Sequence, residues 1–188
     1  MQLAGRRINY WVTPHIGSRL DYQRYLAETD VDGDALLEDW RWLLGPRLQL
    51  WRITKFGDAL LLDPDDASIH FLDVMSGKVE RIAQNQAAFE SALASNENAD
   101  RWLMPQIVDG QAALGMTPGT NECLTLKQPP VLGGQIDPNN FETCSVLVHF
   151  SIAGQIHQQV KDLPPGTKIG KIKIEEPGSA QRPWWKLW

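Results

Sequence analysis

Four short apolar segments between residues 48 and 83 alternate with turn sequences, and this pattern constrains the fold of the 188-residue chain most strongly. Turn residues separate the segments, among them Phe56-Gly57-Asp58 and Ser76-Gly77. Strand-like runs joined by such short links pair with their neighbours as hairpins. The sequence therefore predicts an antiparallel meander of about four strands, over residues 48–54, 58–63, 68–74 and 78–83.

Helical patterns occur on both sides of this meander. Ser18 is placed to cap a first helix, and Pro105 should kink or restart another, because proline lacks the amide that a helix interior uses. Residues 128–140 are expected to form a long loop. Residues 145–150 fit the start of a helix but would also fit a strand. The remaining expected helices cover residues 19–29, 30–45, 85–95, 98–115 and 145–163, and further strands cover 122–127 and 168–175.

This order of elements predicts an α+β fold, with a mainly antiparallel sheet of about five or six strands and packed helices. We expect residues 1–176 to form a single domain, in which residues 1–35 are a reduced N-terminal helical part. Residues 177–188 form a separate Trp-rich C-terminal tail.

The charge of the chain is acidic and unevenly distributed. The net charge is −5, but residues 28–100 hold 15 acidic and 6 basic side chains, a local charge of −9. Nucleic-acid binding needs clustered Lys and Arg, so the sequence disfavours it. The acidity either favours a basic protein partner or only keeps the protein soluble. It also shows no apolar run long enough to span a membrane and no export signal, and its two cysteines form no disulfide framework. We expect a cytoplasmic protein that contacts no membrane.

His149 and His157 are the histidines that an enzymatic or metal site would most readily use. On one helix they would lie about 80° apart around the axis and about 12 Å apart along it. Helical zinc ligands occur four residues apart, and that position after His149 is Ala153. The pair is therefore interpreted as ordinary structural histidines, with His149 in the core or at an interface and His157 at an edge.

Two other motifs resemble ligand sites only in part. Asp30, Asp32 and Asp34 match the first ligand positions of a calcium loop, but the later positions hold Ala35 and Arg41. We interpret this run as an acidic helix start. The Gly133-Gly134 pair lacks the residues of a nucleotide-binding loop and suits a tight turn with positive φ. The sequence thus predicts no catalytic residues, no metal site and no cofactor.

Two surfaces are candidates for binding a partner. The first is the acidic turn at residues 63–68, which we expect to project free carboxylates, with further acidic residues nearby. The second is the tail, because exposed tryptophans either dock on the body or contact another chain, and membrane anchoring is a third reading. The candidate residues are Asp58, Asp63, Asp65, Asp66 and Asp73 for the turn, and Trp184, Trp185 and Trp188 for the tail.

Two stretches resemble a known family. The first reads W-x-x-x-x-F-G-D from Trp51 and leads to a Ser-Gly turn; the second contains P-x-L-G-G, N-x-E and G-Q-I-H between Pro130 and His157. Together, over residues 36–175, they are similar to bacterial type VI secretion immunity proteins, whose members often join a GAD-like domain to this C-terminal domain. Such proteins commonly accompany DNase toxins and share no catalytic residues.

The resemblance implies that the chain binds and neutralises a cognate secreted toxin, in particular a basic DNase, by occluding its active site or its DNA-binding surface. The acidic composition agrees with a basic partner. Two alternatives stay open. One is a non-catalytic small-molecule-sensing or regulatory module, and the other is a hydrolase that uses Asp63, Asp65 or Asp66 with His70.

Overall fold

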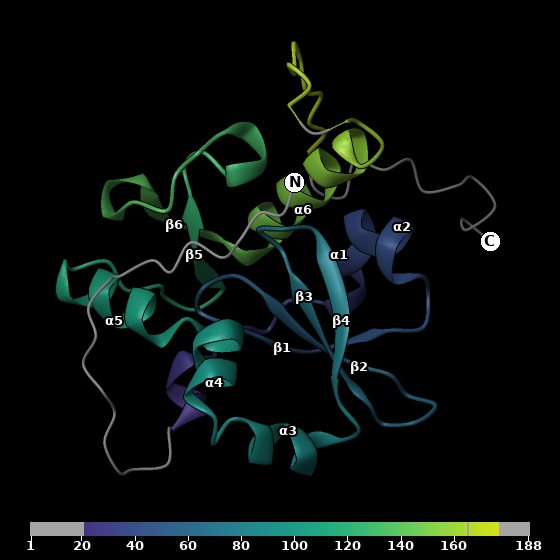
Figure 1. The fold of residues 1–188 in the computed structure, drawn as a ribbon, viewed down its shortest axis with the longest axis vertical. Coiled ribbons are helices and arrows are strands. Elements are labelled where there is room, and N and C mark those ends of the chain that lie inside the picture. The colour runs from purple at the N-terminus through teal and green to yellow at the C-terminus, as the bar shows by residue number, and fades with distance from the viewer. Residues whose placement is uncertain (1–20, 165, 177–188) are drawn as a thin grey trace.

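The computed structural model describes residues 21–164 and 166–176, and it confirms the α+β class. The meander is present as an antiparallel sheet in the order β1-β2-β3-β4 (Figure 1). Its strands are β1 (Gln49–Ile53), β2 (Ala59–Leu62), β3 (Ile69–Asp73) and β4 (Lys78–Ala83).

The central strand β2 is buried on both faces, and its side chains separate two hydrophobic cores. Leu60 packs into one core with Ile69 and Phe71 of β3, whereas Ala59 and Leu61 pack into the other. Successive side chains of a strand point to opposite faces, so both faces must be covered. The sheet is therefore a middle layer with helices on each side.

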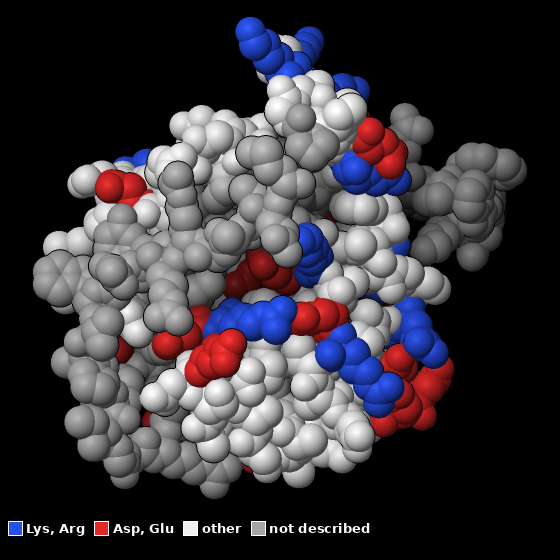
Figure 2. Space-filling model, in the orientation of Figure 1, with Lys and Arg blue, Asp and Glu red and all other residues white. Residues whose placement is uncertain are grey.

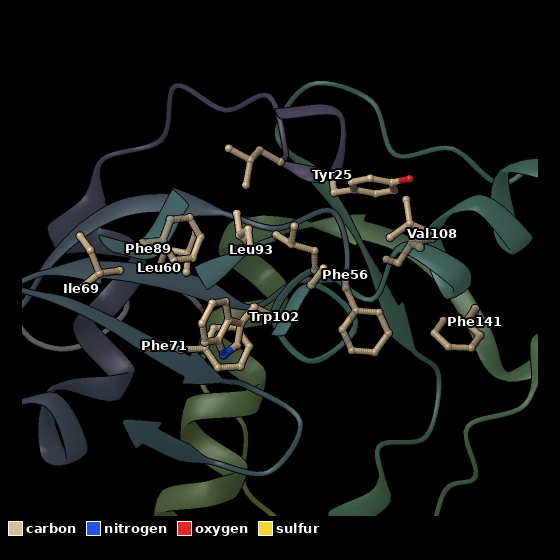
Figure 3. Packing of buried hydrophobic residues seen from close by; sticks show 14 residues of the cluster. Tyr25, Phe56, Leu60, Ile69, Phe71, Phe89, Leu93, Trp102, Val108 and Phe141 are labelled. Carbon is tan, nitrogen blue, oxygen red and sulfur yellow. The ribbon is translucent and has the colours of Figure 1, made fainter. Parts of the chain in front are cut away.

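One face of the sheet is covered by three helices that follow β4. Phe89 of the first stacks on Trp102 of the second, with ring centroids 5.6 Å apart, inside the core shown in Figure 3. Asn85 caps the first helix by accepting a hydrogen bond from the amide of Ala88. At Met104 the backbone adopts φ +47°, and a new helix starts at Pro105 as expected. These helices are α3 (Gln86–Ala92), α4 (Asn96–Leu103) and α5 (Pro105–Ala113).

The opposite face is covered by the acidic helical segment and by the long helix α6 (Val146–Val160). The acidic segment is continuous but irregular: α1 (Gly33–Leu37), η2 (Glu38–Trp40) and α2 (Arg41–Leu44). The indole Nε1 of Trp40 donates a hydrogen bond to the carbonyl of Phe150 at 2.9 Å. A side chain on Gly154 would place its Cβ 2.7 Å from the carbonyl oxygen of Asp39. The acidic segment and α6 can therefore lie this close together because residue 154 is glycine.

Six strands occur in the described residues, but they form two sheets rather than one. β5 (Glu122–Leu126) pairs with β6 (Phe141–Ser145) in a separate two-stranded sheet. The residues expected as a long loop connect these strands and contain the short helices η3 (Pro130–Leu132) and η4 (Pro138–Asn140). Residues 145–150 begin α6 and do not form the strand that they also fitted.

Two expectations for the ends of the chain are wrong within the described residues. Residues 168–175 form no strand; instead Gln155 and Gln159 of α6 hydrogen-bond the backbone of Lys173 and Glu175. The first expected helix is reduced to the 3-10 turn η1 (Tyr22–Tyr25), and its expected cap, Ser18, lies outside the described residues. After η1 the chain becomes extended and pairs with the end of β1, since Leu26 bridges Thr54 and the amide of Ala27 donates to the carbonyl of Ile53.

Candidate functional site

A cavity of about 310 Å³ lies where α6, the two-stranded sheet and one end of the four-stranded sheet meet. Three of the sequence motifs converge on it: the turn Phe56–Asp58, the loop around Pro130 and Leu132, and α6 from His149 to His157. In Figure 1 the turn between β3 and β4 reaches up to α6 at this end of the sheet. Residues far apart in sequence thus line one space, which makes it the principal candidate site.

His149 joins α6 to the turn between β1 and β2. Its Nε2 lies 3.0 Å from the carbonyl oxygen of Gly57, and its Nδ1 lies 2.9 Å from the hydroxyl of Thr125. A carbonyl oxygen only accepts hydrogen bonds, so Nε2 carries the proton and Nδ1 accepts from Thr125. Burial lowers the pKa of His149 to about 4, which keeps the ring neutral at pH 7.

His157 makes the equivalent contact with the turn between β3 and β4. Its Nε2 donates to the carbonyl oxygen of Val74 at 3.0 Å, and its ring packs on Trp40 with centroids 5.6 Å apart. Burial also lowers the pKa of this ring. The histidine expected at an edge is therefore buried, and both histidines connect α6 to the sheet.

Each of these two turns contains a glycine that faces a histidine ring. Gly57 has φ +94°, and a Cβ there would lie 2.6 Å from Nε2 of His149. Gly77 has φ +64°, and a Cβ there would overlap the ring of His157. Both the backbone conformation and the space exclude larger residues. The Phe56-Gly57-Asp58 and Ser76-Gly77 sequences are thus explained by what packs on them.

Asp58 is buried at the same end of the sheet, contrary to the expectation of an exposed acid. It is 3% exposed, and its Oδ1 accepts a hydrogen bond from the amide of Val74 at 2.8 Å. Burial, together with the charge of Asp73, raises the pKa of Asp58 well above its ordinary value. The carboxyl therefore links the two turns and favours its protonated form.

The acidic turn between β2 and β3 is paired with arginines rather than free. Asp63 is 3% exposed and bonds Arg47 at 2.9 Å. Asp65 bonds Arg47 at 3.0 Å, and Asp66 bonds Arg81 at 3.3 Å. In Figure 2, basic and acidic atoms lie side by side at the lower right, where this turn is found. Of the three aspartates, Asp65 and Asp66 stay accessible, with side chains 67% and 48% exposed.

The five candidate aspartates do not form one group. Asp58 immediately precedes β2 and Asp73 ends β3, whereas the acidic turn lies at the other end of the same hairpin. Four to five residues of strand separate the two ends by about 15 Å. The structure thus brings Asp63, Asp65 and Asp66 together and separates them from Asp58 and Asp73.

The remaining candidate residues have local structural partners. Asp32 caps α1 through the amide of Ala35, and Asp34 bonds Arg41, as an acidic helix start requires. His70, which the hydrolase alternative needs, lies 3.1 Å from the Ser68 hydroxyl. Gly133 has φ +87°, as predicted for a tight turn. Trp184, Trp185 and Trp188 lie outside the described residues.

Neither a metal-binding cluster nor a membrane-spanning helix occurs in the described part of the chain. Residues 21–164 and 166–176 contain no cluster of three or more His, Cys, Asp or Glu side chains arranged to hold a metal ion. Within the same residues, no helix has the length and apolar character needed to cross a membrane.

Comparison with known proteins identifies the family that the sequence resembles. Residues 83–157 match the family model of the T6SS immunity protein Tdi1, C-terminal. This segment runs from the end of β4 to His157 and supplies most of the cavity wall. The match confirms the predicted resemblance to a type VI secretion immunity family and supports a role as an immunity protein of that system.

No curated protein sequence matches the chain. Among solved structures, that of Atu4351 from Agrobacterium tumefaciens is similar, with a TM-score of 0.49 and 15% sequence identity. The similarity covers 66% of this chain and 65% of that one, so the chain spans just under two thirds of the length of that protein.

The contact between Gly57 and His149 predicts a selective effect of alanine. Gly57→Ala should lower the free energy of unfolding by about 2 kcal/mol or more, through backbone strain and displacement of the histidine. Gly110→Ala is the matched control, because it lies within α5 and a Cβ there meets nothing within 4 Å. The control should be neutral or stabilise by up to about 1 kcal/mol. Urea denaturation measures both, and equal effects would contradict the account.

The lowered pKa of His149 predicts a stability loss in acid. Between its ordinary value of 6.5 and about 4, the unfolded chain binds a proton that the folded chain does not. This contribution is therefore complete above pH 6.5 and falls as the pH drops towards 4, by on the order of 3 kcal/mol. His149→Gln keeps an amide donor for Gly57 but does not titrate.

Urea denaturation of both proteins between pH 7.5 and 4.5 should thus show a steeper loss for the wild type. Asp58 titrates in the opposite sense, because its raised pKa favours folding in acid, but it is present in both proteins and cancels in the comparison. Parallel pH profiles would show that the His149 ring is not held neutral by the fold.

Proposed function

We propose that this protein binds and neutralises a cognate type VI secretion toxin, and that the toxin is a DNase. The match of residues 83–157 to the Tdi1 immunity family carries the proposal. The local charge of −9 over residues 28–100, from 15 acidic and 6 basic side chains, supports a basic partner. A nuclease needs a basic surface for DNA, and an acidic protein associates with such a surface rapidly. Binding there would occlude the active site or the DNA-binding surface.

The proposed mode is non-catalytic and cytoplasmic. A toxin that cuts chromosomal DNA acts in the cytoplasm, so its inhibitor must meet it there. We also propose one domain for residues 1–176, with residues 1–35 as a reduced N-terminal helical part and residues 177–188 as a tail. The shared core supports this, because Leu60 and Phe71 of the meander pack with Phe89 and Trp102 of the family segment.

Asp65 and Asp66 are the proposed contacts of the acidic turn with the toxin. Both side chains are exposed, and each now pairs with a surface arginine, Arg47 or Arg81. Exposed pairs of this kind contribute only about 0–1 kcal/mol, so a toxin cation can replace the arginine at little cost. Asp63 and Asp58 are buried and would act only by supporting the turns. Asp73, at the opposite end of the sheet, is also proposed to contact the toxin.

The tryptophans of the tail are the rival anchor. Trp184, Trp185 and Trp188 are of the residue type that dominates binding energy at protein interfaces. Removal of the tail and reversal of the turn's charge therefore distinguish the two surfaces.

The decisive experiment is co-expression with the product of the neighbouring gene. We expect that product to kill cells that lack this protein and to co-purify with it. Asp65→Lys with Asp66→Lys should weaken binding at least tenfold, since it places repulsion at a basic interface. Glu97→Lys with Asp162→Lys is the control, because it makes the same change of charge at other exposed positions.

The outcomes separate the claims. A harmless neighbouring product, or one that does not bind, overturns the immunity function. If a chain ending at Gly178 stays folded but loses binding, while the Asp65/Asp66 variant binds normally, the tail is the anchor and the acidic turn is not. If the Asp65/Asp66 variant and the Glu97/Asp162 control weaken toxin binding equally, the effect comes from the net charge of the protein and not from a contact at the acidic turn.

A further inference from the structure

The outer edge of β6 has strand backbone without a partner among the described residues. β5 lies between β6 and the turn after β1, because the amide of Leu124 donates to the carbonyl of Lys55 at 2.8 Å. In an antiparallel pair, backbone groups point alternately towards and away from the neighbouring strand. Leu124 thus points away from β6, and Thr143, which lies opposite it, points away from β5. Thr143 is exposed, and within the described chain its amide and carbonyl make no hydrogen bond.

Two cavities lie beside this strand. Glu142 and Cys144 line the cavity of about 310 Å³ next to α6. Phe141 also lines a second cavity, of about 60 Å³, between α5 and residues 136–138. Successive side chains of a strand point to opposite faces. A strand added to the edge of β6 would therefore direct its side chains alternately to the α6 side and to the α5 side.

An exposed apolar side chain borders each cavity. Leu114 is 69% exposed and lines the smaller cavity, and Ile152 is 37% exposed and lines the larger one. Exposed apolar side chains that are contiguous with an apolar hollow are typical of surfaces that a protein partner covers. The surroundings of β6 therefore favour apolar side chains from such a partner.

The charge of this region fits a basic partner. Glu122 and Glu142 are the only charged side chains of β5 and β6, and Glu142 is exposed. Lys127, at the rim, directs its ammonium to the carbonyl of Asn139 at 2.9 Å. Opposite charges on neighbouring strands attract, whereas a second copy paired antiparallel through this edge would bring two Glu142 side chains to one face. Charge therefore favours a partner strand that carries Lys or Arg.

We propose that an extended segment of the toxin adds to the edge of β6 as a third strand, with an apolar side chain in the larger cavity, the alternate side chain against Leu114 and a Lys or Arg facing Glu142. This inference rests on the proposed immunity function and identifies a second part of the surface that contacts the toxin. In strand addition, backbone hydrogen bonds contribute affinity, and pockets for alternate side chains contribute specificity.

Proline at the edge tests the backbone contact. Thr143→Pro removes an amide that the pairing with β5 does not use, and edge strands tolerate such a proline. It should weaken binding of the neighbouring gene product roughly tenfold or more, because the added strand loses a donor. Asn96→Pro is the matched control, since it replaces an exposed residue at the first position of α4, where proline is favoured. The control should bind within about threefold of the wild type.

Charge reversal of apolar character tests the larger cavity. Ile152→Lys places an ammonium beside the cavity and should weaken toxin binding roughly tenfold or more, because an apolar side chain would then desolvate it. Leu163→Lys is the matched control, because Leu163 is similarly exposed, at 43%, and does not line the cavity. It should bind within about threefold of the wild type. Biolayer interferometry measures all four variants, and circular dichroism establishes that each one folds.

Hydrogen exchange followed by NMR observes the edge directly. The Thr143 amide should exchange rapidly in the free protein and become protected in the complex with the toxin. If the toxin binds but this amide stays unprotected, or each variant binds as its control does, the inference is wrong and the immunity function stands. A chain that forms a dimer through this edge, dissociated by Thr143→Pro, identifies a second copy as the occupant and also overturns the inference. A toxin that does not bind the wild type overturns both proposals.

Discussion

Two hydrogen bonds from histidine rings to backbone carbonyls join α6 to the four-stranded sheet, and the arrangement of the site depends on them. His149 holds the turn between β1 and β2, and His157 holds the turn between β3 and β4, each at 3.0 Å. A helix that merely packed on the sheet through apolar contacts could slide or rotate at modest cost. Directional bonds at two points along its axis set its position and orientation. His149, His157 and Asp58 all line the cavity, so the position of α6 determines one of its walls.

The same arrangement accounts for the position of the family segment. Residues 83–157 contribute the helices over one face of the meander, the second sheet and α6 over the other face. The matched segment therefore packs on both faces of a sheet whose strands come almost entirely from earlier in the chain. His149 and His157 are among the residues that hold the two parts together. Glycine at 57 and 77 is required because the rings occupy the space of a side chain.

Local sequence signals predicted the parts of the fold that depend on local physics. The meander and the restart at Pro105 follow from turn chemistry and from the missing proline amide. Strand β6 was not predicted, because Phe141–Ser145 is short, mostly polar and half exposed. Residues 168–175 alternate as a strand should, but their backbone pairs with glutamine side chains of α6 rather than with a neighbouring strand. Propensity does not reveal which partner a segment will meet.

The site shows the same division between local and distant information. Helical spacing alone excluded chelation by His149 and His157, but their roles depend on turns about 80 to 90 residues away. The acidic turn was recognised, whereas its arginine partners lie on other segments, and the burial of Asp58 depends on α6.

The tautomers of the two histidines test the account most directly. Long-range ¹H–¹⁵N correlation spectra at pH 7 should show both rings neutral, with the proton on Nε2 and a bare Nδ1. The His149 ring should stay in this form down to about pH 5. A proton on Nδ1 of either ring, or titration of His149 near 6.5, would contradict the hydrogen bonds on which the structure of the site rests.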